Sequence, residues 1–415
     1  MKIEVGFGAG TQVAEIPEEN LIKILRADVR SQGPAGEQAV LDSLSNPVES
    51  LRLKDMVKPG EKISIITSDI TRPMPTWAVA PHVLDELYEA GVSKSDITLV
   101  FALGAHRPHT EEEMIELAGE RVYSEVRCVD SNPADCISMG FTRRGTPIDI
   151  TRIVAEADRR ICLGNIEYHY FAGYSGGAKA LMPGVSTPEA IQVNHKMMTD
   201  PDACIGKLDG NPIREDVEEA AGIVGIDFIC NVVLDENKKI IHAVSGDVTA
   251  AHREGCAFLD GIYQVKIPEL ADIVIVSQGG APKDMNLYQT QKALDNSKFA
   301  VKDGGTIILV GSCREGSGNK VFEEWMTSAK SPEEITERIR REFKLGGHKA
   351  AAIAMVMAKA QISMVSEMEP EFVRTLFMEP YCNLQQAFDD AIKKHGKDAK
   401  VVVMPYGGST LPKLI

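Results

Sequence analysis

The spacing of apolar residues predicts strands that alternate with helices along the whole chain. Short, nearly continuous apolar runs between polar or glycine turns are typical of buried strands, and apolar residues three or four positions apart are typical of helices. The predicted strands are 1–5, 62–68, 96–103, 160–163, 226–233, 240–245, 271–277, 304–311 and 399–404, and the predicted helices are 77–90, 287–300, 332–343 and 348–361. This alternation predicts an α/β fold with parallel or mixed sheets that helices cover on both faces.

The length of the chain predicts more than one domain. At 415 residues it is longer than a single hydrophobic core usually supports. We therefore expect two α/β domains with the functional site in the cleft between them. We assign 1–268 to an N-terminal domain that binds the cofactor and 269–398 to a C-terminal domain. Residues 399–415 form a terminal strand and tail, and the pattern leaves open whether they return to the first domain.

The segment 160–196 carries the strongest concentration of reactive side chains. A predicted strand ends there at Gly164, and no helical period follows until Thr187-Pro188, which fit an N-cap and a first helical position. His169 and Lys179 flank a glycine-rich turn, and His195 lies on the helix. Glycine-rich segments before a helix often bring backbone N–H groups to an anion, and ordered loops of this length are usually functional. Any one of these side chains alone could equally be a surface residue, but the three together favour a site.

Several polar residues fall at the carboxyl ends of predicted strands: Asp69, His106, His169 and Gln278. Ligands bind at the carboxyl edge of open α/β sheets, so one pocket could collect all four. Shortly after His106, Thr110 and Glu113 predict a capping box at the start of a helix.

Each motif also has a plainer interpretation. Arg72, in the D-x-T-R-P motif, suits a two-pronged clamp on a carboxylate or phosphate, but it could be an exposed residue beside an Asp or Thr cap. His106 suits proton transfer, although a lone loop histidine is more often structural. Gln289 and Lys292 share one helical face and suit a hydroxyl and a carboxylate, or form an ordinary polar face.

Composition and charge narrow the class of protein. Hydrophobic residues make up 44% and charged residues 25% of the chain, as in an ordinary soluble globular protein. A formal charge of −15 argues against a nucleic-acid partner. The chain has neither an apolar run long enough to cross a membrane nor a signal-peptide core, so we expect a cytoplasmic protein with no membrane partner.

The sequence also lacks the signatures of common enzyme classes. The eight cysteines include no C-x-x-C pair, so a disulfide framework or a structural zinc site is not expected. Walker A, H-E-x-x-H and G-x-S-x-G motifs are missing. Gly6-Phe7-Gly8 follows only a short strand, and Thr11 stands where a dinucleotide fingerprint needs a third glycine, which disfavours an NAD-dependent dehydrogenase.

Taken together, the motifs resemble those of the nickel-dependent lactate racemase family. The matching elements are D-x-T-R-P at 69–73, G-A-H-R at 104–107, H-Y-F-A-G-Y-S-G-G-A-K at 169–179, His195 and Y-Q-T-Q-K at 288–292. They agree with the family in order and spacing, and they cover most of the chain and both predicted domains.

The resemblance implies a cofactor and a role for each residue. The family carries nickel(II) pyridinium-3,5-bisthiocarboxylic acid mononucleotide, a nickel-pincer nucleotide whose metal is bound by one ring carbon, two sulfurs and one protein histidine. It implies Lys179 as the covalent tether through a thioamide, His195 as the nickel ligand, and His106 and His169 as acid/base residues. By the same resemblance, the nucleotide is bound by Asp69, Ile70, Thr71 and Arg72, and the substrate by Gln289, Lys292 and Arg72.

The resemblance further implies an isomerase, a racemase or epimerase of 2-hydroxy acids. The C–H bond at C2 of such an acid is very weakly acidic, so hydride removal with transfer of the hydroxyl proton to a base is an alternative to deprotonation. The planar 2-keto acid then takes hydride back on its other face, which requires two bases. The implied partners are a small 2-hydroxy acid and the enzymes that make the cofactor, and protein from a host without those enzymes is expected to lack it. A sugar-acid C2 epimerase and a non-catalytic organic-acid or phosphate-binding protein stay open as alternatives.

Overall fold

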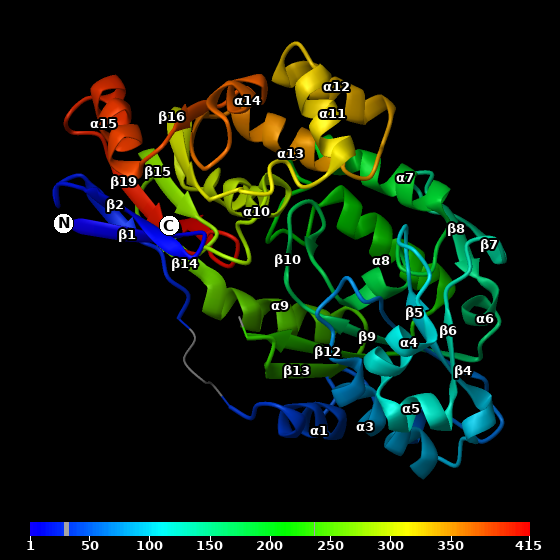
Figure 1. Cartoon of the computed structure of the whole chain (residues 1–415). Helices are drawn as coiled ribbons and strands as arrows, with labels where there is room; N and C mark the ends of the chain where they lie inside the picture. The colour runs from blue at the N-terminus through cyan, green and yellow to red at the C-terminus, as the bar shows by residue number, and fades with distance from the viewer. Residues whose placement is uncertain (29–32, 236) are drawn as a thin grey trace. The chain divides into compact units, whose positions relative to one another are not determined.

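The computed structural model describes residues 1–28, 33–235 and 237–415, and its chain forms two compact units (Figure 1). The central unit is Val29–Asp260, and the terminal unit joins Met1–Asp28 to Gly261–Ile415. Each unit contains a six-stranded sheet and several helices, which confirms the predicted α/β fold. Among the described residues, no helix has the length and apolar composition that a membrane span needs.

The sheet of the central unit has the order β13-β12-β9-β4-β5-β6. All neighbouring strands are parallel except β12 and β13, which form an antiparallel pair. The strands are β4 (Ile63–Ser68), β5 (Ile97–Ala102), β6 (Arg127–Asp130), β9 (Arg159–Asn165), β12 (Phe228–Leu234) and β13 (Ile240–Gly246). Because β4, β5, β6, β9 and β12 are parallel, their carboxyl ends meet at one edge of the sheet, where the predicted site residues follow.

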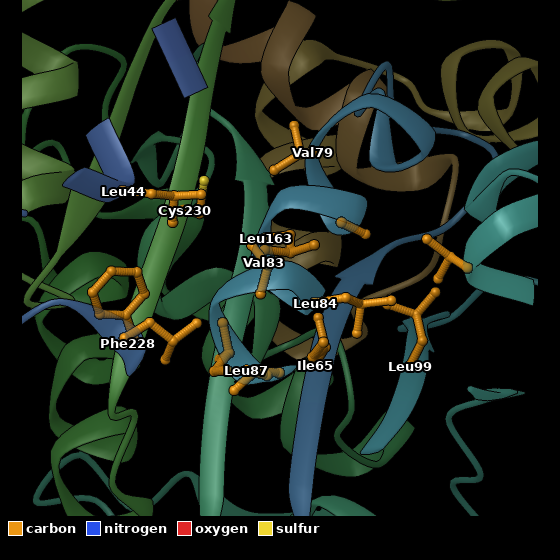
Figure 2. Packing of buried hydrophobic residues seen from close by; sticks show 14 of the residues in the cluster. Leu44, Ile65, Val79, Val83, Leu84, Leu87, Leu99, Leu163, Phe228 and Cys230 are labelled. Carbon is orange, nitrogen blue, oxygen red and sulfur yellow. The ribbon is translucent and has the colours of Figure 1, made fainter. Parts of the chain in front are cut away.

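Helix α3 (Thr76–Glu89) covers one face of this sheet because its apolar residues recur at helical spacing. Figure 2 shows the side chains on its inner face, Val83 and Leu84 among them, beside strand residues such as Ile65 and Leu99. All four of these side chains are fully buried. Burial of an aliphatic side chain of this size contributes about 1.5–3 kcal/mol, so this layer is a main source of the unit's stability.

The described part of the central unit also contains two small hairpins and eight further helices. Two small hairpins are formed by β7 (Cys136–Phe141) with β8 (Pro147–Thr151) and by β10 (Tyr168–His169) with β11 (Gly173–Tyr174). The helices are α1 (Glu37–Ser45), α2 (Leu53–Met56), α4 (Glu111–Ala118), α5 (Glu120–Glu125), α6 (Arg152–Ala155), α7 (Pro188–Lys196), α8 (Pro212–Val224) and α9 (Ala250–Tyr263), with short 3-10 turns at 94–96, 177–180 and 197–199. The last residues of α9, from Gly261 on, belong to the terminal unit.

The terminal unit is built on an entirely parallel sheet with the order β18-β17-β16-β15-β19-β3. Its strands are β3 (Leu21–Ile24), β15 (Ala271–Ser277), β16 (Val301–Val310), β17 (Gln361–Val365), β18 (Glu379–Tyr381) and β19 (Val401–Met404), with the smaller pairs β1 (Lys2–Phe7)–β2 (Gly10–Glu15) and β14 (Gln264–Ile267)–β20 (Leu411–Leu414). Its helices are α10 (Leu287–Ser297), α11 (Lys320–Ser328), α12 (Pro332–Arg341), α13 (Gly347–Met357), α14 (Pro370–Thr375) and α15 (Leu384–His395).

The units divide the chain differently from the predicted domains 1–268, 269–398 and 399–415. The first 28 residues belong to the terminal unit because β3 pairs with β19, with Leu21 opposite Val401. The final segment also stays in the terminal unit, since β19 lies between β15 and β3 in its sheet. Within the predicted N-terminal domain, residues 29–32 and 236 lie outside the described residues.

Candidate active site

The loops after β4 and β5 form a hydrogen-bonded pair of side chains at the carboxyl edge of the central sheet. Asp69 follows β4, is only 3% exposed, and accepts a hydrogen bond from His106 Nδ1 at 2.7 Å on Oδ2. Its Oδ1 accepts from the Thr71 hydroxyl at 3.0 Å. Burial raises the pKa of the Asp69 carboxyl, but the hydrogen bond and charge of His106, with smaller effects of Thr71 and Arg72, outweigh it and leave that pKa below its usual value. A carboxylate that orients an imidazole is the usual partner of an acid/base histidine.

A second histidine holds the 69–72 loop in place. His109 has no exposed side-chain area, and its Nδ1 and backbone N–H both donate to the carboxylate of Asp130, at 2.6 and 2.8 Å. Because Nδ1 carries the proton, Nε2 can accept, and it receives the backbone N–H of Ile70 at 3.0 Å. His109 is therefore a supporting residue of the loop, and the predicted capping box from Thr110 to Glu113 opens α4 directly after it.

The glycine-rich turn lies against the face of the sheet opposite α3. Asn231 of β12 is fully buried and accepts the backbone N–H of Gly177 at 2.7 Å. His252 of α9 donates from Nε2 to the backbone carbonyl of Ser175 at 2.8 Å. Gly177 has φ +58°, and a Cβ there would lie 2.8 Å from the His252 ring. The turn that carries Lys179 is thus positioned by side chains from two other elements.

We expect Gly177→Ala to destabilise the protein by about 1–3 kcal/mol. Alanine is strained at this positive φ, and its methyl group would lie too close to the imidazole of His252. The loss of stability is measured as the decrease in the free energy of unfolding, determined by urea denaturation. Gly222→Ala is the matched control, since Gly222 is exposed within α8 and nothing lies within 4 Å of the position that its new methyl group would take. That change should instead stabilise by roughly 0.5–1 kcal/mol. Equal stability of the two variants would contradict the packing described for Gly177.

Lys179 lies on the 3-10 turn Gly177–Ala180 in a cationic environment. Burial lowers the pKa of its ammonium group well below the usual value, and the charges of Arg214 and Arg72 lower it further, against a smaller opposite effect of Glu167. Its Nζ lies 5.8 Å from the centroid of the Phe171 ring. A lowered pKa increases the fraction of neutral amine, the nucleophilic form of lysine.

His169, on the hairpin β10–β11, belongs to the same cluster. Burial lowers the pKa of His169 well below its usual value, and the nearby charges of Lys179, Arg72 and His195 add to that effect. Its Nδ1 accepts the backbone N–H of Ala172 at 3.3 Å. The structure therefore brings together four of the predicted site residues, His169, Lys179, Arg72 and His195. His106 is connected to the 69–72 loop by its hydrogen bond to Asp69.

His195 lies near the end of α7, which begins as predicted with Thr187 as N-cap and Pro188 at the first helical position. Its Nδ1 is 3.0 Å from the side-chain oxygen of Asn194. The ring of Phe171 contacts it edge-on, with centroids 4.8 Å apart. Phe171 is thus close to both the imidazole of His195 and the amine of Lys179.

Arg214, which the sequence motifs do not indicate, is a buried cation beside the β10–β11 hairpin. It is fully buried on α8, and it donates to the backbone carbonyls of Ala172 and Tyr174, at 3.3 Å from Nε to the first of these. No carboxylate forms a hydrogen bond with it among the described residues, so its charge acts on Lys179 and on His169. Its only sequence signal is an arginine on the inner face of an amphipathic helix.

The lowered histidine pKa values make stability depend on pH. Burial, together with the charge of Arg214, lowers the pKa of His252 to about 3, and that of His169 is also well below 6.5. The unfolded chain binds protons at these imidazoles near pH 6.5, whereas the folded chain does not. The free energy of unfolding is therefore retained above about pH 6.5 and falls as the pH drops below it. For His252 the fall is about 1.4 kcal/mol per pH unit down to about pH 3, and His169 contributes in the same direction. In His252→Gln, the free energy of unfolding, measured by urea denaturation at several pH values in this range, should depend less steeply on pH by the contribution of one proton. An unchanged pH dependence would contradict the burial of a neutral His252.

The remaining predicted residues lie in the terminal unit. Gln289 and Lys292 are exposed on the first turns of α10, on one face as predicted, and Asn286 caps this helix by accepting the backbone N–H of Gln289 at 3.0 Å. Lys349 of α13 donates to the backbone carbonyl of Tyr288 at 2.6 Å. Gln278 follows β15 and therefore belongs to a different sheet from Asp69, so the argument from a single sheet edge does not unite them.

Comparison with known proteins agrees with these motifs. A family model of the lactate racemase N-terminal domain matches residues 7–206, and one of the lactate racemase C-terminal domain matches residues 267–411. The chain belongs to the lactate racemase family. Lactate racemases of Thermoanaerobacterium thermosaccharolyticum and Lactiplantibacillus plantarum are 34% and 32% identical to it, with 99% of this chain and 98% and 99% of theirs covered.

Solved structures agree with the membership of this chain in the lactate racemase family. The structure of the lactate racemase apoprotein from Thermoanaerobacterium thermosaccharolyticum matches with a TM-score of 0.88 and 33% identity over 100% of both chains. A crystal structure of a Thermotoga maritima protein matches with a TM-score of 0.64 over 93% of this chain and all of that one. At 19% identity, the second likeness concerns the fold alone.

The residues of this lactate racemase family member that could hold a metal are few. Within the part of the chain that the structure describes, no group of three or more His, Cys, Asp or Glu side chains is placed to hold a metal ion. The rings of His195 and His106 are each hydrogen-bonded at Nδ1 by another side chain, Asn194 and Asp69, as is usual for a metal-ligating histidine at its other nitrogen.

Proposed function

We propose that this chain is an isomerase that inverts the C2 carbon of a 2-hydroxy acid such as lactate, with a nickel-pincer nucleotide tethered to Lys179. The observation that carries the proposal is the environment of Lys179, where burial and two guanidinium groups lower the pKa of the amine beside His169 and His195. A neutral amine is the form that can be acylated, and the surrounding positive charge suits the phosphate of a nucleotide and the carboxylate of a substrate.

The protein donors fit this cofactor. The pincer nucleotide brings one carbon and two sulfur ligands to nickel and leaves a position for one imidazole, which agrees with a site that offers His195 and, among the described residues, no cluster of protein ligands. Lys179 would hold the organic part through a thioamide, and the 69–72 loop with Ile70 and Thr71 would contact the nucleotide. When bound, the group supplies an electrophilic centre that accepts hydride from C2 of the substrate and returns it.

The chain's own side chains supply the proton transfers. His106 donates from Nδ1 to the Asp69 carboxylate, so its Nε2 carries a lone pair that can take the proton of the substrate hydroxyl. His169 accepts a backbone N–H at Nδ1, so its neutral ring carries the proton at Nε2 and can donate a hydrogen bond from there to a keto oxygen. The two rings would thus present a proton acceptor and a hydrogen-bond donor to the substrate oxygen.

The cationic side chains hold the substrate through both half-reactions. Arg72 is exposed on its loop, close enough for its charge to affect His169 and Lys179, and its guanidinium can bind the substrate carboxylate through two hydrogen bonds. Gln289 and Lys292 present a hydroxyl-binding amide and a second positive charge from one helix face. Tight retention of the keto acid prevents its loss before hydride returns.

Lactate is the substrate that the relatives support. The two relatives that cover the whole chain are both named lactate racemase, and their identity of 32–34% extends over both units. The family resemblance also includes enzymes for other 2-hydroxy acids and for sugar acids, so a C2 epimerase with the same residues is the second candidate. A non-catalytic organic-acid-binding protein would use Arg72 and Lys292 but has no use for a neutral Lys179 beside His195.

A label at C2 tests the reaction type. Protein co-expressed with the enzymes that make the cofactor is incubated with L-lactate carrying deuterium at C2, and the products are separated by chirality. We expect D-lactate that retains the deuterium, because hydride leaves and returns without exchange with water. Loss of the label to solvent would contradict hydride transfer in favour of proton abstraction. Absence of any D-lactate, with inversion of a sugar acid instead, would support the epimerase.

A further inference from the structure

A buried carboxylate with no cationic partner among the described residues lies behind His195. Asp216 of α8 is fully buried, and it accepts three hydrogen bonds from neutral groups. The hydroxyls of Thr142 and Thr146, in the turn between β7 and β8, donate to it at 2.5 and 2.7 Å. The third donor is the side-chain amide of Asn194, at 2.7 Å. Such a carboxylate is costly to bury unless its hydrogen bonds are made, so the arrangement is specific.

This carboxylate determines the orientation of the Asn194 amide. Asn194 is fully buried, and only its NH₂ group can donate to the acceptor oxygens of Asp216. Its Nδ2 also faces the backbone carbonyl of Ile213 at 3.4 Å. The side-chain oxygen must therefore point away from Asp216, and it lies 3.0 Å from His195 Nδ1. The usual ambiguity between the O and N atoms of an asparagine is removed by its neighbours.

We infer that Asp216 and Asn194 are positioning residues that hold His195 as the Nδ1–H tautomer, so that Nε2 carries the lone pair for a metal. An amide oxygen can only accept, so the ring nitrogen that faces it must be the donor. The proton on Nδ1 leaves the lone pair of the neutral ring on Nε2. A metal-bound histidine is usually fixed by such a hydrogen bond at its other nitrogen, and here a buried anion reinforces it through the amide. The use of this lone pair by nickel rests on the proposed function, whereas the tautomer does not.

The tautomer of His195 can be measured in the protein without cofactor. Long-range ¹H–¹⁵N correlation spectra of the ¹⁵N-histidine-labelled chain distinguish protonated from unprotonated ring nitrogens, and His195→Gln assigns the signal. At about pH 8, above the ordinary imidazole pKa, we expect a proton on Nδ1 and none on Nε2. A proton on Nε2 in the unaltered chain would overturn the inference.

Variants separate this role from a merely structural one. Asn194→Ala removes the acceptor, so His195 should shift toward the Nε2–H tautomer that free histidine prefers. Asn194→Asp combined with Asp216→Asn exchanges the two side chains, keeps an acceptor toward Nδ1 and should restore the Nδ1–H tautomer. Thr146→Val is the matched control, because it removes a hydrogen bond from Asp216 without altering Asn194 and should leave the tautomer unchanged. An unchanged tautomer in Asn194→Ala would overturn the inference, as would a changed one in Thr146→Val.

The nickel content of variants tests the positioning role of Asn194 separately from the role of His195 as nickel ligand. In protein loaded by co-expression and dialysed against a chelator, Asn194→Ala should weaken nickel retention by about 10–100-fold while the organic adduct stays on Lys179. Nickel retention equal to that of the unaltered chain would contradict the positioning role. If His195→Ala also retained nickel, the proposed ligand itself would be wrong, whatever tautomer the spectra show.

Discussion

Replacing either His169 or His106 by glutamine is expected to lower turnover by about 10²–10⁴-fold in both directions. Each inversion removes a hydroxyl proton on one face of the keto acid and returns one on the other, so neither imidazole serves only one enantiomer. The hydrogen bonds of the two rings, to Asp69 and to the backbone N–H of Ala172, place their protons on opposite nitrogens. Initial rates from L-lactate and from D-lactate, measured separately at equal cofactor load, provide the test.

The matched control for these variants is His82→Gln. His82 lies on α3 in the same unit, and its ring is 3.4 Å from the carboxylate of Glu37, away from the reactive cluster. This variant should keep normal rates. Nearly normal turnover of His106→Gln or His169→Gln in either direction would rule out that residue as a proton carrier.

Lys179→Ala should abolish the covalent adduct completely, and with it the retention of nickel. A single thioamide bond to this amine holds the cofactor in the proposed account, and Lys179 combines burial with two neighbouring guanidinium groups that favour its neutral form. Lys179→Arg is the more informative variant, because it keeps a positive charge but cannot form the bond. Both are measured by intact-protein mass and by nickel analysis after co-expression.

Lys207→Ala is the control for the tether. Lys207 lies beyond α7 in the same unit, and its ammonium group pairs with the Asp202 carboxylate at 2.5 Å. This variant should carry the full adduct. An adduct that persists in Lys179→Arg would contradict tethering at Lys179, and one lost from Lys207→Ala would point to a general effect on loading.

Local patterns were sufficient to predict much of the fold. The apolar runs at 62–68 and 96–103 correspond to β4 and β5, and the helical spacing at 77–90 corresponds to α3. The capping box at Thr110 and the cap at Thr187 are both confirmed, because such signals act within a single turn of helix. In these cases the determinant of the element lies inside its own sequence.

Long-range pairings were not predictable in the same way. The run Leu21–Ile24 is too short to be predicted as a strand from its sequence. It pairs with β19, far along the chain, with Val401 opposite Leu21. The assignment of the first residues to the terminal unit depends on this pairing. Periodicity says which face of a strand is apolar but does not say which strand it joins.

The reactive residues of the site were predictable, whereas their supports were not. His169, Lys179 and His195 stand out because histidine and lysine around a glycine-rich turn are unusual, and the structure gathers them. Arg214, Asn231 and Asp216 act through buried contacts to backbone and amide groups from other elements, and in the sequence they look like ordinary residues of a helix or strand. The charge that lowers the pKa of Lys179 is therefore evident only from the fold.

The most direct test of this account is the intact mass and nickel content of the unaltered chain after co-expression with the enzymes that make the cofactor. We predict a mass increase that maps to Lys179 and about one nickel per chain, as a single imidazole ligand implies. An unmodified mass without nickel, from cells in which the cofactor is shown to be made, would contradict the account and leave an organic-acid-binding protein on a lactate racemase fold.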